Sequence, residues 1–213
     1  MLPLLDSAEV RVLGSLIEKE ATTPEYYPLS LNALVNACNQ KSNREPVVNY
    51  DDETVLAAIE GLREKRLALI ATGGGRVTKY GQRLSETLNL GRRELAALCT
   101  LLLRGQQTLG EIKDRSERMF SFADLAEAER LLQKLQELPD GPLVKKLPRQ
   151  PGQKEARYAH LFSGESAEQL SSENSGITEA PSRVSMLEQE LQTLRADFEE
   201  LKRRFNDLEG QLR

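Results

Sequence analysis

The fold is decided by residues 27–83, which read YPLSLNALVNACNQKSNREPVVNYDDETVLAAIEGLREKRLALIATGGGRVTKYGQR. Apolar residues recur every three or four positions in two parts of this stretch, which predicts helices at 31–40 and 52–66. Ser30 and Asp51 stand directly before these helices, and both residue types are favoured N-caps. The stretch is therefore expected to begin with two amphipathic helices joined by a long connection.

Two short runs rich in β-forming residues follow the second helix. They predict strands at 67–71 and 76–80, and the three glycines between them, Gly73–Gly75, predict a tight turn. Two helices followed by a hairpin with a glycine tip are typical of a winged helix. The residues expected to face the core are Leu31, Leu34, Val35 and Cys38 in the first helix and Val55, Leu56, Ile59 and Leu62 in the second.

Outward from this stretch, the same pattern occurs a second time. A helix at 7–20, capped by Asp6 or Ser7, precedes the first copy, and a similar helix follows Asn89. Two sets of residues match at constant spacing: Glu9, Leu13, Leu16, Ile17, Lys19 and Thr23 correspond to Glu94, Leu98, Leu101, Leu102, Arg104 and Thr108. Such agreement is the signature of a duplicated module.

The second copy carries its own start signals. Thr108 and Glu111 form a capping-box pattern that opens a short helix. Ser121 is placed to cap the next helix, at 122–138, and strands are expected at 143–147 and 156–162. The residues of the longer helix expected to face the core are Leu125, Ala128, Leu131, Leu132 and Leu135.

These patterns predict an α+β protein that is mainly helical. The Ser- and Glu-rich segment after the second copy has no helical face and is expected to be a flexible linker. The predicted organisation is a winged-helix domain at 1–88, a second one at 89–163, the linker at 164–182 and a coiled-coil helix at 183–213.

The coiled coil is predicted from heptads with apolar residues at both core positions. The residues expected to form the seam are Leu187, Leu191, Leu194, Phe198, Leu201, Phe205 and Leu208. In a parallel pair, all four g-to-e contacts would join opposite charges, which favours a parallel homodimer. A helix folded back on its own domains and a heteromeric partner remain alternatives, and the two phenylalanines leave the strand number open.

Composition limits the class of protein. The chain has 213 residues and a formal charge of −4, which gives no global attraction to nucleic acid. It lacks an apolar run long enough for a membrane helix and a basic start typical of a signal peptide, so a soluble cytoplasmic protein is expected. Cys38 and Cys99 each lie among apolar residues and are expected to be buried free thiols.

Several runs resemble the YceH family of uncharacterised bacterial proteins. They are Tyr27–Leu34, Asn39–Pro46, Gly74–Tyr80, Phe122–Glu127, Leu147–Gln153 and Glu155–His160, and the resemblance extends from about Ser7 to Ser163. It implies two tandem winged-helix domains. It implies no established activity and therefore no functional residues, and it does not include the predicted coiled coil.

Nucleic-acid binding is the first functional hypothesis, with double-stranded DNA as the partner. The net charge is −2 for residues 1–88, +2 for 89–165 and −4 for 166–213. Acidic residues occupy the first turn of the helices that would enter a groove, so contacts are expected from the hairpins. The candidate phosphate-binding residues are Lys145, Lys146, Arg149, Lys154 and Arg157 on the second hairpin and Arg76 and Lys79 on the first. The competing interpretation is an ordinary solvated hairpin edge.

Protein docking is the second hypothesis. The connection after the first helix offers amide and guanidinium donors that would bind carboxylates or backbone of a protein partner; these are Asn39, Gln40, Lys41, Asn43 and Arg44. The competing interpretation is that these side chains satisfy the backbone of a long loop.

Catalysis has little support in the sequence. His160 is the only histidine, the cysteines lack metal-ligand spacing, and the three glycines join strands and do not open a helix. The expectation is therefore a protein that is not an enzyme, with no cofactor and no metal site.

Overall fold

The computed structural model describes residues 3–71, 77–139, 141–149 and 152–163. These belong to the first of two compact units, Met1–Glu168. The predicted linker, the coiled coil and its seven seam residues, the Gly73–Gly75 turn and Arg76 lie outside the described residues. Within them the protein is α+β and mainly helical, with seven α-helices and two three-stranded antiparallel sheets.

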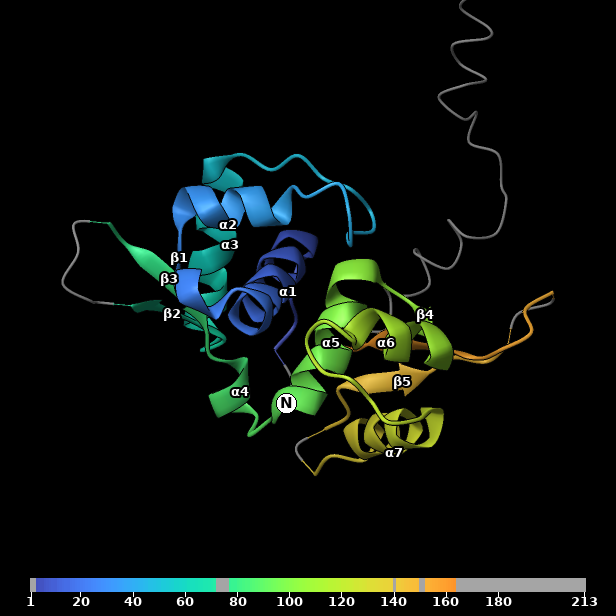
Figure 1. Cartoon of the computed structure of the whole chain (residues 1–213). Coiled ribbons are helices and arrows are strands. Elements are labelled where there is room, and N and C mark those ends of the chain that lie inside the picture. Colours follow the sequence, from blue (N-terminus) through green and yellow to red (C-terminus); the bar gives the residue numbers. More distant parts are fainter. Residues whose placement is uncertain (1–2, 72–76, 140, 150–151, 164–213) are drawn as a thin grey trace, which may run out of the picture. The chain divides into compact units, whose positions relative to one another are not determined.

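The first module contains three α-helices and a 3-10 helix before its hairpin (Figure 1). Its elements are α1 (Ser7–Thr22), the 3-10 helix η1 (Pro24–Tyr26), β1 (Leu29–Ser30), α2 (Leu31–Cys38), α3 (Asp52–Glu64), β2 (Ala68–Ala71) and β3 (Lys79–Gln82). The strand order is β1-β3-β2, so the last strand of the module is central in its sheet. A short helix, α4 (Leu84–Thr87), then leads to the second module.

The second module repeats this order. Its elements are α5 (Arg92–Arg104), β4 (Gln107–Thr108), α6 (Leu109–Ser116), α7 (Leu125–Gln136), β5 (Val144–Lys146) and β6 (Arg157–His160). Its sheet has the order β4-β6-β5, which is the same topology as in the first module. Both copies therefore begin with a long helix, and both place their last strand between the other two.

Where the sequence predicts a cap, a polar side chain caps the helix as expected, with one exception, whereas α4 and α5 have no side-chain cap. Asp6 and Glu9 form a reciprocal capping box at α1, and Thr108 and Glu111 form another at α6. Ser30 and Asp51 cap α2 and α3. The exception is α7, because Asp124 and not Ser121 accepts the hydrogen bond from the Glu127 N–H, at 2.7 Å.

Two residues expected in the core lie at the surface. Leu56 is 37 % exposed and Leu125 is 49 % exposed. Leu125 is the first residue of α7, so the helix starts three residues later than predicted and its first turn faces solvent. Leu56 follows the buried Val55 directly, and adjacent positions on a helix point about 100° apart, so the two do not share the inner face.

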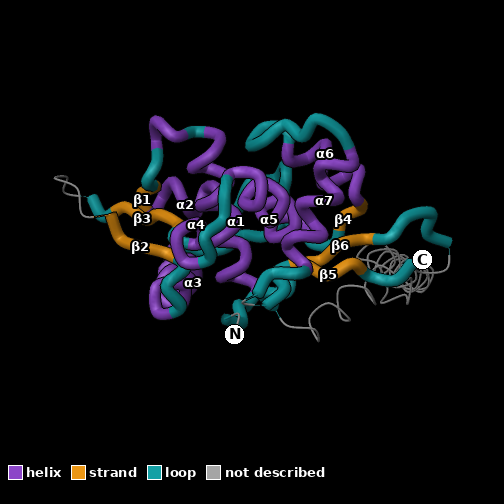
Figure 2. The backbone as a smooth tube through the Cα atoms, turned by 90° about the horizontal axis from the view of Figure 1, so that it is seen from below, coloured by secondary structure: helices purple, strands orange, loops and turns teal. Residues whose placement is uncertain are grey.

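The two modules pack together through α1 and α5. Figure 2 shows these helices side by side in the middle of the unit, with the two sheets at opposite ends. A Cβ added at Gly14 would lie 2.8 Å from Leu103 Cδ2, so the glycine permits the close approach. Opposite the same turn, Cys99 Sγ donates a hydrogen bond to the Gly14 carbonyl at 3.3 Å. One apolar cluster continues through both modules.

No helix in the described residues combines the length and the apolar character needed to cross a membrane.

Candidate nucleic-acid interface

The second hairpin is built from β5, β6 and the turn between them. Val144 pairs with His160 and Lys146 pairs with Tyr158, and the Leu147 N–H donates to the Arg157 carbonyl at 2.7 Å. Residues 143–160 contain five cationic side chains and one carboxylate, Glu155. Figure 1 shows this hairpin projecting beyond the body of its module. The chain therefore carries a concentrated positive charge on a protruding element.

The structure places Lys146 over a neighbouring ring. Its Nζ lies 5.5 Å from the centre of the Tyr158 ring and 3.6 Å from Glu129 Oε1. The contact with Tyr158, followed by the charge of Glu129, raises the pKa of Lys146. Lys146 is therefore cationic at neutral pH and is held at the base of the hairpin.

The other cations of this hairpin fall into two groups. Arg157 is half-buried and pairs with Glu111 at 3.2 Å, and it also donates to the Gln106 carbonyl at 2.9 Å, so it holds the hairpin against the module. Lys145, Arg149 and Lys154 are exposed. Arg149 precedes the turn and Lys154 follows it, and both side chains are exposed.

Lys79 does not join this group. It is exposed on β3, in the sheet of the first module, and Figure 2 shows that sheet at the end of the unit opposite β5 and β6. The structure therefore brings together the candidates of the second hairpin and separates Lys79 from them.

The helices preceding the hairpins are acidic where they begin. Asp51, Asp52 and Glu53 are exposed at the start of α3, and Asp124 caps α7 with Glu127 in its first turn. Carboxylates there are favourable for the helix dipole but repel phosphates. Among the described residues, the charges therefore favour phosphate contacts by the second hairpin over phosphate contacts by the start of α3 or α7.

The connection at 39–46 was expected to offer donors to a partner, and the structure instead directs most of them inward. The Asn39 side chain donates to the Tyr50 carbonyl at 2.7 Å and accepts from the Tyr50 N–H at 2.8 Å. Arg44 is buried against Glu18 at 2.6 Å. Asn43 Oδ1 accepts from Arg104 of the second module. Lys41 is exposed, and Gln40 is partly exposed.

The reactive side chains of the described residues are buried. Cys38 and Cys99 are free thiols, and burial raises the pKa of each, which disfavours the nucleophilic thiolate. Within the described ranges, no three His, Cys, Asp or Glu side chains are grouped so that they could hold a metal ion.

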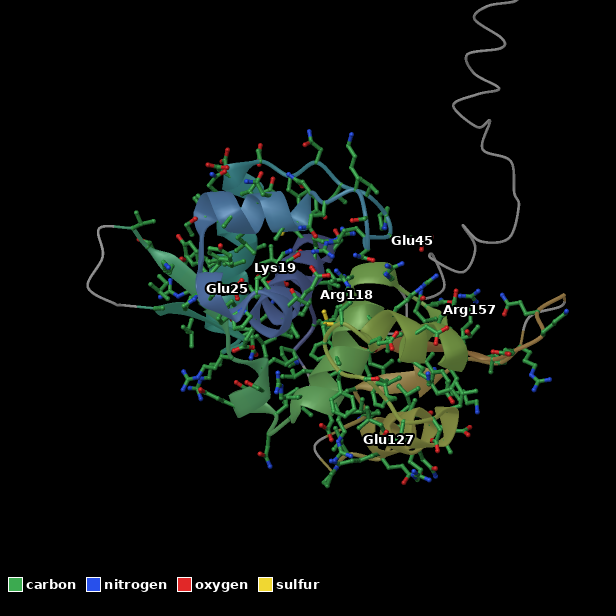
Figure 3. All side chains as sticks on the ribbon, in the orientation of Figure 1. Lys19, Glu25, Glu45, Arg118, Glu127 and Arg157 are labelled. Carbon is green, nitrogen blue, oxygen red and sulfur yellow. The ribbon has the colours of Figure 1, made fainter. Side chains whose placement is uncertain are left out.

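Sequence reasoning missed a group of arginines where the modules meet. Arg104 ends α5, Arg115 lies near the end of α6, and Arg118 follows α6. Figure 3 labels Arg118 beside α5 and α6. Arg104 and Arg115 are partly exposed on their helices and Arg118 lies in the turn after α6, so the sequence gives no sign that the three belong together.

Residues 5–153 match the family described as "Protein of unknown function, DUF480". The chain is 53 % identical to a UPF0502 protein of Pelobacter propionicus, with 98 % of each chain covered. It is 54 % identical to a UPF0502 protein of Solibacter usitatus, covering 94 % of this chain and 98 % of the relative. A UPF0502 protein of Aeromonas hydrophila is 46 % identical, with 97 % of this chain and 99 % of the relative covered.

Proposed function

The chain belongs to the family described as protein of unknown function DUF480, as its resemblance to the YceH family predicts, and we propose that it binds double-stranded DNA and is not an enzyme. In this proposal both modules are winged-helix domains. The repeated order of helix, strand, two helices and two strands supports that assignment, as does the central position of β3 and β6 in their sheets. The hairpin after the third helix is then the wing.

The second hairpin carries the proposal. It presents exposed cations on both sides of its turn, Arg149 and Lys154, with Lys145 and the cationic Lys146 at its base. Side chains of this type bind the phosphates of the DNA backbone, which fixes position but reads no sequence. Because the starts of α3 and α7 are acidic, the proposed binding is dominated by backbone contacts and has little sequence preference.

Docking through the connection at 39–46 has less support. Arg44 and Asn39 are satisfied inside the first module, so the loop offers a partner few donors without rearrangement. DNA binding through the hairpin requires no such change.

Replacing Arg149 and Lys154 together with glutamine is expected to weaken duplex binding about tenfold near 100 mM salt. Each phosphate contact contributes about 0.9 to the slope of log affinity against log salt, so that slope should fall by nearly two. Fluorescence anisotropy with a labelled 30-base-pair duplex, measured from 50 to 200 mM KCl, gives both quantities. These two positions are chosen because Lys146 also packs on Tyr158 and pairs with Glu129.

A matched control removes two cations elsewhere. Arg63 and Arg83 are exposed in the first module, each in a short ion pair, and replacing both with glutamine changes the net charge by the same amount. The control should bind as the parent does. Equal weakening in both variants, or no duplex binding at 50 mM KCl, would refute the proposed hairpin contact.

We also propose that residues 183–213 form a parallel coiled-coil homodimer. This rests on the heptad pattern of the sequence alone. A dimer would present two cationic hairpins to one duplex, and the second contact would then form at high effective concentration. Weak single contacts would in this way add up to useful affinity.

Introducing Leu194→Asp and Leu201→Asp into the full chain is expected to halve the mass measured by sedimentation equilibrium. Both leucines occupy d positions, where a buried carboxylate opposes association. Ala196→Asp places the same charge at an outward-facing f position and should leave the dimer intact. A parent chain that sediments as a monomer at micromolar concentration would disprove the dimer.

A further inference from the structure

Three arginines of the second module lie near the end of α5. Arg104 and Arg118 contact the first module, and Arg115 is connected to Arg104 through Gln107. We call Arg104, Arg115 and Arg118 the junction arginines. The Glu45 N–H donates to the Leu103 carbonyl at 2.8 Å, so the connection lies directly against the end of α5. Figure 3 shows Glu45 and Arg118 near this contact.

Each junction arginine is held by a polar contact with its neighbours. Arg104 donates to Asn43 Oδ1, and Arg115 donates to Gln107 Oε1. The Gln107 amide in turn donates to the Arg104 carbonyl at 3.0 Å, which links Arg104 to Arg115. Arg118 Nη2 lies 3.2 Å from Glu18 Oε1 in α1. The three guanidinium groups are thus held by neighbours from both modules.

The carboxylates near the junction arginines do not balance their charge. Glu18 is shared by Arg118 and the buried Arg44, and Glu111 is shared by Arg115 and Arg157. Arg104 forms no salt bridge to any described carboxylate, although Glu45 is close enough for its charge to act on it. Glu18 also pairs with Lys19 at 3.9 Å, so five guanidinium groups and one ammonium group share three carboxylates, those of Glu18, Glu45 and Glu111.

The charges of Arg115 and Arg118 act on Arg104. Burial, followed by the charges of Arg115 and Arg118, lowers the pKa of Arg104. An anion bound among the three groups would offset this repulsion. The group is also reachable from solvent, since 58 % of the Arg118 side chain and 31 % of the Arg115 side chain are exposed.

We propose that Arg104, Arg115 and Arg118 form a binding site for a phosphate group at the junction of the two modules. Planar guanidinium donors match the oxygens of phosphate in geometry and charge. A dianion would neutralise the excess positive charge of the cluster. This site does not include Arg149 and Lys154, which carry the proposed hairpin contact, although Glu111 joins Arg115 to Arg157 at the start of β6. Its phosphate can come from a nucleic-acid backbone or from a small phosphorylated molecule.

The test is a thermal unfolding titration of the full chain with inorganic phosphate, at constant ionic strength set with chloride. At about ten times the dissociation constant, the Tm should rise by about 3 to 5 °C. Arg118→Gln should remove this rise, because it takes away one of the three guanidinium groups of the site. The variant should still fold, since Arg118 is exposed and Glu18 keeps its pair with Arg44. Arg93→Gln is the matched control, since Arg93 is 54 % exposed and likewise forms one salt bridge, with Glu127.

The outcomes separate this site from the proposed hairpin contact. A phosphate-dependent rise in the parent and in Arg93→Gln but not in Arg118→Gln supports the site. An equal rise in all three proteins, or no rise in the parent, overturns it. Duplex affinity of Arg118→Gln then identifies the source: a loss of about fivefold indicates backbone phosphate, and unchanged affinity indicates a small phosphorylated ligand. The phosphate result holds even if the parent binds no DNA.

Discussion

Replacing Arg44 with methionine is expected to lower the free energy of unfolding by about 3 to 5 kcal/mol. The Arg44 and Glu18 side chains are 0 % and 4 % exposed, and they approach to 2.6 Å. Arg44 also donates to the Ala37 carbonyl from two nitrogens, at 3.1 and 2.9 Å. Methionine fills much of the space but leaves a buried carboxylate with Arg118 as its main partner and a carbonyl without its donor. Urea denaturation at pH 7 measures the loss.

Two further variants show whether burial is the cause. Arg63 and Glu60 form an ion pair of similar length, but their side chains are 39 % and 56 % exposed, so Arg63→Met should change stability by less than about 1 kcal/mol. Combining Arg44→Met with Glu18→Leu should lower the free energy of unfolding by less than the sum of the two single changes. The double variant removes both charges of the buried pair, whereas each single change leaves one of them without this partner. A loss under about 1 kcal/mol for Arg44→Met would contradict this account.

The repeat and the helix starts were predictable because both are local in the sequence. The match between Glu9–Thr23 and Glu94–Thr108 compares positions one by one, and it correctly predicts two modules of the same topology. An N-cap side chain bonds a backbone N–H only three residues later, so the caps Asp6, Ser30 and Thr108 could be predicted from the local sequence. The buried state of Cys38 and Cys99 followed in the same way from their apolar neighbours.

The strands were harder to predict because they are short and depend on partners. β1 and β4 contain two residues each, and neither has a period-2 pattern to detect. Each exists because a later strand, β3 or β6, pairs with it across the sheet. The same dependence moves the last strand of the first module from the predicted 76–80 to Lys79–Gln82, in register with β2.

The sequence shows which residues of the candidate sites are charged or polar, but it does not show which other residues they contact. Arg44 stands among polar residues and looked like a donor for a partner, but it pairs with Glu18, which is 26 positions away. Nothing local signals that contact. The junction arginines depend in the same way on α1 packing against α5, so their shared position appears only in three dimensions. The hairpin cations were predictable because a hairpin keeps sequence neighbours together.

Lowering the pH from 7 to 4.5 is expected to destabilise the protein by about 2 kcal/mol through His160 alone. Burial lowers the pKa of His160 to about 4, against about 6.5 in the unfolded chain. The folded state therefore favours the neutral ring. Stability from this group is complete above pH 6.5 and is lost as the pH falls toward 4, because only the unfolded chain binds the proton in that range.

The geometry around His160 accounts for this shift. Its residue surface is partly exposed, but Nδ1 is buried and has no hydrogen-bond partner among the described residues. The ring lies 6.2 Å from the ring of Phe162, which is fully buried. A protonated Nδ1 would thus carry a donor and a charge into an apolar setting, which is unfavourable without a partner.

His160→Leu provides the measurement, since the chain contains a single histidine. Urea denaturation of both proteins at intervals from pH 7.5 to 4.5 gives two stability profiles, and subtracting one from the other removes the effects of carboxylates common to both. As the pH falls, the free energy of unfolding of the parent should decrease relative to that of the leucine variant, with most of the change between pH 6.5 and 4.5. Parallel profiles would mean that the folded protein accommodates the imidazolium, and that Nδ1 finds a partner on protonation.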